Sequence, residues 1–335
     1  MISLVSTVLN DKQGLELFFN HMEAQTLRPD EIVIVDGGST DGTWEFLQKY
    51  SNEGAIALKC FQELGCNVAR GRNLAIKHAS YDVIASTDIG CKWEAKWLEE
   101  LTRPLFKETS LEAVMGSWQV HWKDLKSDWA RVDYLLNNEL RFLATPQSHA
   151  SSRSIAYRKT LWKRIGGYPE DLTLAGDDMV FALLLHKATN KVDCAPIPRC
   201  YWERPIKLKS FCKEAQRNFL GGGEAGIWIE YGIWAGGRLF LELLLLILGF
   251  LTLIFSFYAG ISIILLIFAS ISVGFRIFDI KNYISKEREN IPKNFFLKSI
   301  VFLYSVKFYS LIGYWSGFLN GKLKSQDCRN RLAHS

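Results

Sequence analysis

The chain has 335 residues, of which 48% are hydrophobic and 22% are charged, and its net charge is +5. Its seven cysteines include no CxxC pair, which argues against a disulfide scaffold or a zinc site and suits a reducing compartment. The positive charge lies mainly around apolar segments of the last two thirds and accompanies no nucleic-acid-reading motif, so it predicts contact with membrane lipid and not with nucleic acid.

The first ninety residues alternate between strand and helix patterns. Strands are predicted at 2–8, 31–35, 56–61 and 83–87, and helices before Pro29, at 43–50 and at 68–79. This repeated alternation predicts an α/β domain with a doubly wound sheet. No basic, apolar leader precedes the first strand pattern, so we expect this domain to stay in the cytosol.

Two acidic residues follow strand patterns directly. Asp36 comes after the apolar run 31–35, and Asp88 comes after 82–87. In doubly wound sheets ligands bind beyond the carboxyl ends of the strands, which makes both acids candidates for a site. Each could instead cap a helix or form a turn.

The middle of the chain has a looser pattern, with scattered aromatic residues. Trp122, Trp129 and Tyr134 are predicted to cover an acceptor site. A strand at 154–158 and a helix at 159–165 follow, and Gly166-Gly167 is typical of a helix end. A further helix is predicted at 177–187, with two acidic residues in its first turn, where they would also favour the helix dipole.

The loop Val-Asp-Gly-Gly-Ser-Thr-Asp-Gly-Thr at 35–43 resembles the signature loop of family 2 glycosyltransferases. The resemblance implies a GT-A fold and a nucleotide-sugar donor held by Asp36, Gly37, Ser39 and Asp41. Asp36 would contact the base or the ribose, because a carboxylate accepts hydrogen bonds from base N–H groups or hydroxyls. Gly37 stands where the family often has a second acid, so uracil as the base is not implied.

Two further segments resemble this family in the same order along the chain. Ala-Arg-Gly-Arg-Asn at 69–73 is similar to its Arg-Asn element and implies that Arg70, Arg72 and Asn73 meet the donor diphosphate, although a solvated basic helix face has the same pattern. Thr-Asp-Ile-Gly-Cys at 87–91 takes the place of the DxD motif, which implies a divalent ion, Mg²⁺ or Mn²⁺, at Asp88. Gly90 replaces the second acid, and a later residue such as His149 could assist.

The acids at the start of helix 177–187 stand at the position of the family's Glu-Asp motif. The resemblance implies that Asp178 is the base that deprotonates the acceptor hydroxyl and that Asp177 orients it or tunes its pKa. The segment 216–223 loosely resembles the Gln/Arg segment of membrane-associated members, so Arg217 could contact a phosphate, or the segment could be an interfacial helix that ends in glycines. The resemblance covers residues 1 to 230, the predicted catalytic domain.

The rest of the chain is strongly apolar. Segments at about 239–255 and 258–277 are long enough to cross a bilayer as a helical hairpin, with buried core helices as the alternative. Basic residues after the hairpin predict that both of its ends lie in the cytosol. Lys298 and Lys307 interrupt a third apolar segment at 295–319, which favours an interfacial or re-entrant helix over a third crossing. We thus expect a membrane anchor at 231–321 and a basic tail at 322–335.

These features together predict an integral protein of the inner or plasma membrane with a cytosolic catalytic domain. Its predicted reaction is an inverting transfer of a sugar from a nucleotide-sugar donor to a membrane-linked or polysaccharide acceptor. The alternatives are a polyprenyl-phosphate sugar synthase, whose lipid phosphate acceptor needs little deprotonation, and a non-catalytic sugar-nucleotide-binding protein, which the missing second acids would suit.

Overall fold

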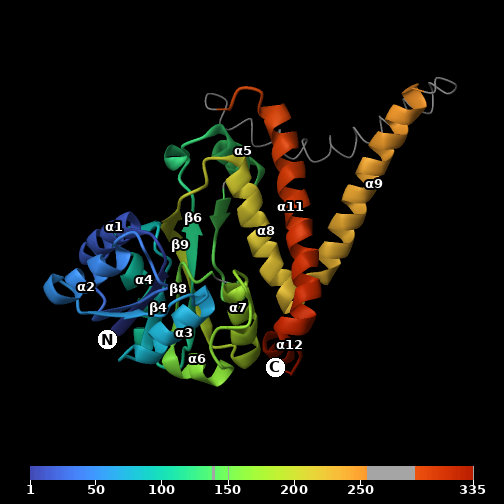
Figure 1. Ribbon diagram of the computed structural model, residues 1–335. Helices are drawn as coiled ribbons and strands as arrows, with labels where there is room; N and C mark the ends of the chain where they lie inside the picture. The colour runs from blue at the N-terminus through green and yellow to red at the C-terminus, as the bar shows by residue number, and fades with distance from the viewer. Residues whose placement is uncertain (138–139, 150, 255–290, 335) are drawn as a thin grey trace.

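The protein is described here by a computed structural model, which covers residues 1–137, 140–149, 151–254 and 291–334 (Figure 1). Its described strands form one sheet in the order β3-β2-β1-β4-β8-β6-β9-β5, with β7 paired to β6. The strands are β1 (Ile2–Val8), β2 (Glu31–Asp36), β3 (Leu58–Gln62), β4 (Val83–Ser86), β5 (Cys91–Trp93), β6 (Ala113–Gln119), β7 (Arg141–Phe142), β8 (Ile155–Arg158) and β9 (Val192–Trp202).

Helices connect these strands and continue after the last of them. They are α1 (Lys12–Glu23), α2 (Thr43–Glu53), α3 (Val68–His78), α4 (Trp97–Lys107), α5 (Asp128–Leu136), α6 (Lys159–Ile165), α7 (Asp177–Ala188), α8 (Leu208–Ala225), α9 (Ile229–Ile254), α11 (Phe295–Lys324) and α12 (Gln326–His334), with a short 3-10 helix at Trp122–Asp124. The elements predicted at 2–8, 31–35, 43–50, 68–79, 83–87, 154–158, 159–165 and 177–187 are confirmed within a few residues, and the strand predicted at 56–61 lies at Leu58–Gln62.

The sheet is mixed, whereas the predicted doubly wound sheet would be parallel. Strands β3, β2, β1 and β4 are parallel, but β8 runs antiparallel to both β4 and β6. The register pairs Ser86 of β4 with Ile155 of β8. Because the two strands run in opposite directions, the residues just before β8 lie beside the carboxyl end of β4. This topology brings the loop before β8 to the edge of the sheet at which a ligand is predicted to bind.

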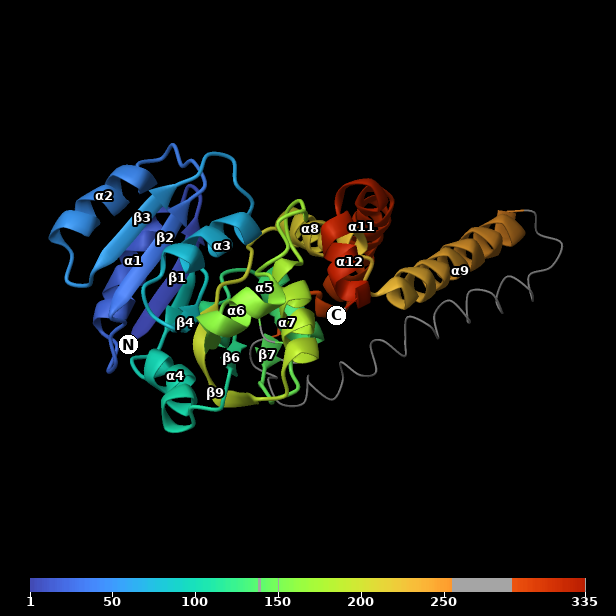
Figure 2. The same ribbon diagram turned by 90° about the horizontal axis from the view of Figure 1, so that it is seen from below.

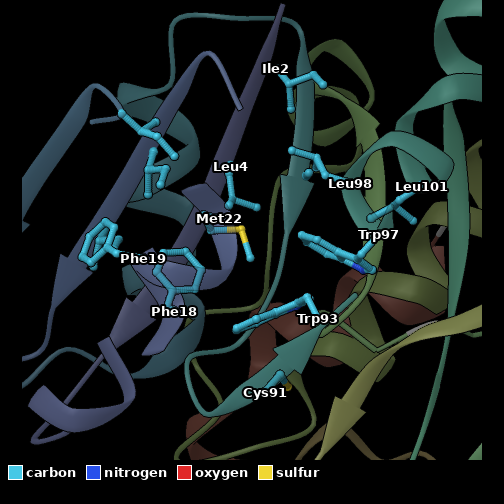
Figure 3. Packing of buried hydrophobic residues seen from close by; sticks show 14 of the residues in the cluster. Ile2, Leu4, Phe18, Phe19, Met22, Cys91, Trp93, Trp97, Leu98 and Leu101 are labelled. Atoms are coloured by element: carbon cyan, nitrogen blue, oxygen red, sulfur yellow. The ribbon is translucent and has the colours of Figure 1, made fainter. Parts of the chain in front are cut away.

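Both faces of the sheet are covered, because side chains along a strand alternate between its two faces. Leu4 of β1 joins a buried cluster with residues of α1 and α4, and Figure 3 shows it near Met22 and Trp97. The next residue, Val5, belongs to a second buried cluster that contains residues of α3, α6 and α7. Helices therefore cover both faces of the sheet, as they do in the predicted α/β arrangement.

Helix α11 packs along α8, and the two helices lie side by side in both views (Figures 1 and 2). Their backbones touch at glycines: a Cβ atom at Gly317 would lie 2.0 Å from the carbonyl oxygen of Leu220, and one at Gly313 would lie 2.2 Å from that of Gln216. Phe302 of α11 also meets Phe211 of α8, with ring centroids 5.2 Å apart. The predicted helix at 295–319 thus forms part of the domain's packing.

The aromatic residues of the middle stretch join the same packing. Trp122 and Tyr134 contact one another, with ring centroids 5.3 Å apart, and both pack with Trp129 against a cluster formed by α5, α8 and α11. Their predicted role in covering an acceptor stays a prediction, since in the structure they hold α5 against the two long helices.

The other predicted parts of the anchor have different outcomes. Residues 229–254 form α9, which leads away from the sheet (Figures 1 and 2), and the segment predicted at 258–277 lies outside the described residues. Among the described helices one, over Phe295–Gly321, is long and apolar enough to span a membrane, with a mean hydropathy of 1.5 and 28% of that stretch buried.

The segment predicted to be a basic tail forms α12, which packs on the loops around α6 and α7. The backbone N–H of Cys328 donates to Asp171 Oδ2 at 3.1 Å, and Arg331 Nη2 donates to the carbonyl oxygen of Gly167 at 2.6 Å. Helices α11 and α12 thus both pack on elements of residues 1–230, and the domain boundary expected at residue 230 stays a prediction.

The glycine contacts between α8 and α11 predict a stability difference between two matched substitutions. Gly317→Ala should lower the free energy of unfolding by about 1–3 kcal/mol, because its methyl group has no room beside Leu220. Gly237→Ala on α9, where none of the described residues lies within 4 Å of the added atom, should be neutral or stabilising by up to about 1 kcal/mol. Thermal unfolding of the purified full chain, followed by tryptophan fluorescence, measures both. Equal midpoints for the two variants would contradict the backbone contact.

Candidate active site

The buried guanidinium of Arg72, in the second turn of α3, connects two acids from distant parts of the chain. Its Nη2 donates to Asp88 Oδ1 at 2.5 Å, and its Nη1 donates to Asp177 Oδ2. The Arg72 side chain is 6% exposed. Its Nε has no hydrogen-bond partner among the described residues. The structure thus brings together three predicted site residues, at the end of β4 and the start of α7.

Burial and charge act differently on the two acids. The pKa of Asp177 is raised to about 6, mainly by burial. The charge of Arg72 lowers this pKa, and the negative charges of Asp178 and Asp88 raise it. Burial also opposes ionisation of Asp88, but Arg72 and Arg153 outweigh it and hold the pKa of Asp88 below its usual value. Asp88 is therefore the acid of the pair that stays ionised over the wider pH range.

Aromatic rings pack beside the ion pairs of Arg72. The Cζ atom of Arg72 lies 5.5 Å from the ring centroid of Tyr168, which follows the glycine pair after α6. Tyr168 stacks on Phe181 of α7 with centroids 4.0 Å apart. Because Phe181 belongs to the same helix as Asp177, this stack fixes the acid and its arginine together.

Asp178 differs from Asp177 in its exposure. Asp177 is buried, whereas Asp178 is partly exposed, and its Oδ2 accepts a hydrogen bond from Ser151 Oγ at 2.9 Å. Gly176 caps the start of this helix, α7. Its φ of +91° suits glycine, and a Cβ atom at this position would lie 3.0 Å from the carbonyl carbon of Gly221 in α8. An accessible carboxylate beside a buried one is the arrangement that a base and its orienting partner require.

A cavity of about 490 Å³ opens at the carboxyl ends of β1 and β2. Gly37 and Arg217 line it, as do Asp11 and the helix cap Asn67. Arg217 also helps to lower the pKa of Asp88, so its charge reaches the acid at the end of β4. The cavity lies where open α/β sheets bind ligands.

Two predicted donor-binding acids shape the loop beside this cavity. The buried carboxylate of Asp36 accepts hydrogen bonds from the Ser39 N–H at 3.0 Å, from Ser39 Oγ and from Gln62 Nε2 at 2.9 Å. Asp41 accepts from the Thr43 N–H at 3.1 Å at the start of α2. In this state Asp36 and Asp41 hold the loop, and Ser39 Oγ accepts from the N–H of Asn10 at 2.8 Å.

Arg70 and Asn73 lie away from the cavity. Arg70 is half exposed and donates to Glu63 Oε1 at 2.8 Å through Nε. Asn73 Oδ1 accepts from the Tyr168 N–H at 2.9 Å and from Trp162 Nε1 at 3.0 Å. Asn73 therefore fixes the turn after α6, and the predicted contact of Arg70 and Asn73 with the donor stays a prediction.

Metal donors around Asp88 are few. The described residues contain no group of three His, Cys, Asp or Glu side chains that could hold a metal ion. Gly90, in the place of the second DxD acid, has a φ of +92°, a conformation that an aspartate would adopt only with strain. His149 lies against His186 of α7, with ring centroids 5.2 Å apart. Among the described residues, Asp88 therefore has no pair of partners with which it could hold an ion.

Sequence reasoning missed Arg153 and Ser151, which lie just before β8. Arg153 Nε is 3.7 Å from Asp88 Oδ2, and its Nη1 donates to Ser151 Oγ at 3.1 Å. No periodicity or motif marks these residues. They reach the site because β8 runs antiparallel to β4, a pairing that a prediction of parallel strands excludes.

Comparison with known proteins agrees with this geometry. Residues 3–166 match the model of the family described as glycosyl transferase family 2. Glycosyltransferase AglE of Haloferax volcanii is 23% identical over 180 residues, which cover 52% of this chain and 58% of that protein. The O-antigen chain rhamnosyltransferase WbaN of Salmonella anatum is 25% identical over 229 residues, which cover 62% of this chain and 72% of that protein.

A solved structure extends the likeness in fold along most of the chain. The mannosyltransferase PcManGT from Pyrobaculum calidifontis superposes with a TM-score of 0.55 at 17% identity, over 95% of this chain and 86% of that one. The fold is thus the GT-A fold of glycosyltransferases. In sequence, the family that residues 3–166 resemble is family 2 of the glycosyltransferases, and both of these curated relatives are named as transferases of that kind of chemistry. Its alignment with AglE spans less than two thirds of that relative.

Proposed function

We propose that this enzyme transfers a sugar, with inversion at the anomeric carbon, from a nucleotide-sugar donor to an acceptor at a membrane surface. The observation that supports this most is the position of Asp178, an accessible carboxylate one residue from the Arg72-bound Asp177. Asp88 follows β4 by two residues, and the next residue, Ile89, lines the cavity. Arg72 binds both Asp88 and Asp177, so the acid pair at the start of α7 is linked to the loop beside the cavity.

The donor in this proposal occupies the cavity beside Gly37 and Arg217. Glycine lets a nucleoside approach the backbone, and an arginine matches phosphate charge. The mannosyltransferase from Pyrobaculum calidifontis was solved in complex with GDP-Man and Mn²⁺, and WbaN is named as a rhamnosyltransferase. These names support a nucleotide sugar as the donor class for this chain and leave its base and sugar as questions for a donor screen.

The chemistry assigns one role to each side of the site. Asp178 takes the proton of the acceptor hydroxyl, whose oxygen then forms a bond to the anomeric carbon. The bond from that carbon to the diphosphate oxygen breaks, and its electron pair leaves with the diphosphate. Asp177, fixed by Arg72, keeps Asp178 at the start of α7 in position. Arg217 offers positive charge to the leaving group.

A divalent ion, Mg²⁺ or Mn²⁺, fits this site as an ion that arrives with the donor. Such ions are often held by one or two carboxylates together with substrate phosphates, and Asp88 supplies one carboxylate. When bound, the ion would offset charge on the diphosphate.

Membrane attachment in this proposal rests on the apolar surfaces of α9 and α11. Large apolar side chains are exposed along both helices, among them Trp234 and Phe240 on α9 and Phe296 and Phe308 on α11. Contiguous apolar surface of this kind is typical of a membrane or partner contact. Since α11 packs on α8, which also carries Arg217, the lipid surface would lie close to the donor cavity. A lipid-linked acceptor is therefore favoured over a soluble glycan.

The role of Asp178 predicts a selective loss of turnover in Asp178→Asn. The rate constant for transfer should fall by about 10²–10⁴-fold, because the amide cannot accept the acceptor proton, while donor affinity should change little. The assay measures nucleoside diphosphate released by detergent-solubilised full chain across a panel of nucleotide sugars and of lipid-linked and polysaccharide acceptors. Asp82→Asn, at an exposed acid before the amino end of β4, is the matched control. Full activity of Asp178→Asn would instead favour a polyprenyl-phosphate acceptor.

The exposed surfaces of α9 and α11 predict a specific fractionation result. After cell lysis the full chain should sediment with membranes and stay there during a wash with alkaline carbonate, because burial of apolar side chains does not depend on charge. Detergent should release it. Release by carbonate or by high salt alone would contradict integral attachment and indicate a peripheral, charge-based contact.

A further inference from the structure

Arg153 has a fixed backbone next to the acid at the end of β4. Thr87 Oγ1 donates to the carbonyl oxygen of Arg153 at 2.8 Å, and Thr87 itself accepts from Trp93 Nε1 at 2.9 Å. Asp88 is the residue after Thr87, so the antiparallel pairing of β4 with β8 sets Arg153 and Asp88 side by side. The position of this arginine is therefore a property of the sheet.

The guanidinium of Arg153 is held in place by aromatic rings. Its Cζ lies 3.8 Å from the ring centroid of Trp202 at the end of β9 and 5.8 Å from that of Trp118 on β6. Stacking on a ring orients a guanidinium and leaves the N–H groups at its edge available for hydrogen bonds. The Arg153 side chain is 21% exposed, so this oriented cation still has access to the site.

The edge of this guanidinium lies between the two functional acids. Nη1 donates to Ser151 Oγ at 3.1 Å, and Ser151 in turn donates to Asp178 at 2.9 Å. On the other side Nε is 3.7 Å from Asp88 Oδ2, too long for a hydrogen bond. Within the described part of the chain, Nε and Nη2 of Arg153 make no hydrogen bond. Two nitrogen atoms of Arg153, Nε and Nη2, can thus donate hydrogen bonds at the point where the sugar donor and the acceptor would meet.

Arg153 also differs from Arg72 in how its charge is used. Arg72 is committed to two acids through both of its Nη atoms. Arg153 has a single, longer ion pair, to Asp88. Because Gly90 supplies no second acid, less negative charge faces Arg153 than a paired-acid motif would place there. An anionic group that enters between Asp88 and Asp178 would find a fixed and largely uncommitted cation.

We propose that Arg153 binds the sugar-linked phosphate of the donor and stabilises the diphosphate as it leaves. This inference rests on the proposed function, since it needs a nucleotide-sugar donor in the cavity. In the transfer step the Nε and Nη2 donors bind phosphate oxygens while the electron pair of the broken bond passes to the leaving oxygen. A guanidinium fork matches two phosphate oxygens, and the charge it meets grows as the bond breaks.

The test compares nucleotides that contain or lack the second phosphate. Uridine, guanosine and thymidine diphosphates and the matching monophosphates are titrated by calorimetry into the detergent-solubilised full chain, with EDTA present throughout. Arg153→Gln should weaken the binding of the preferred diphosphate by about 10–100-fold, the loss expected for hydrogen bonds to a charged group. Binding of the monophosphate should stay within about twofold, and Arg153→Lys should restore part of the diphosphate affinity.

Two controls separate this role from an indirect one. Ser151→Ala removes the hydrogen-bonded link between Arg153 and Asp178, and it should leave diphosphate affinity unchanged. A loss of affinity equal to that of Arg153→Gln would show that Arg153 acts through Ser151, and it would overturn the inference. Arg164→Gln, at an arginine paired with Glu112 on the far side of β8, should bind like the wild type. Unaltered diphosphate binding in Arg153→Gln, or an equal loss for mono- and diphosphate, would also overturn it. Absence of diphosphate binding by the wild-type chain would overturn the proposed function itself.

Discussion

The two hydrogen bonds from the guanidinium of Arg72 connect parts of the chain that are otherwise far apart. Asp88 follows the parallel strand β4 by two residues, and Asp177 begins a helix 89 residues later, yet both carboxylates meet one side chain that is 6% exposed. Removal of one partner from a buried ion pair typically costs about 3–5 kcal/mol, because the other charge stays buried and unpaired. The site geometry and the stability of this region therefore depend on the same contact.

Helix α8 connects this site with the apolar C-terminal helices. Its Gly221 lies against the loop that ends at Gly176, and its buried Glu224 accepts a hydrogen bond from the Thr173 N–H at 2.8 Å in the same loop. The opposite side of α8 meets the backbone of α11 at Gly317. A displacement of α11 would therefore reach the start of α7 through packed backbone. This arrangement gives α11, the described helix that is long and apolar enough to span a membrane, a direct structural role in the packing around the site.

Much of the first half of the fold could be predicted from sequence, because its signals are local. The apolar runs of β1 and β2 and the spacing of α3 and α7 reflect burial, and the motif order located Asp88, Arg72 and Asp178 before their contacts were known. Long-range pairing has no such local signal. The antiparallel pairing of β8 with β4 places Arg153 at the site. The packing of α11 and α12 on earlier helices and loops depends on glycines and arginines, which also occur on exposed helix surfaces and therefore give no signal in the sequence. Residue roles followed the same division: Asn73 matched a motif, yet its side chain is used to fix a turn.

The most direct test of the central role of Arg72 is the pH dependence of sugar transfer in Arg72→Lys. A lysine keeps the charge but, as a single point donor, cannot hold Asp88 and Asp177 in the same fixed geometry. Because Arg72 lowers the pKa of Asp177 against burial, weaker pairing should raise that pKa above its value of about 6. We predict that kcat/KM falls at least about 100-fold and that its acidic limb moves to higher pH, since ionised Asp177 is then lost at a higher pH. A wild-type kcat/KM with an unshifted acidic limb would contradict the account.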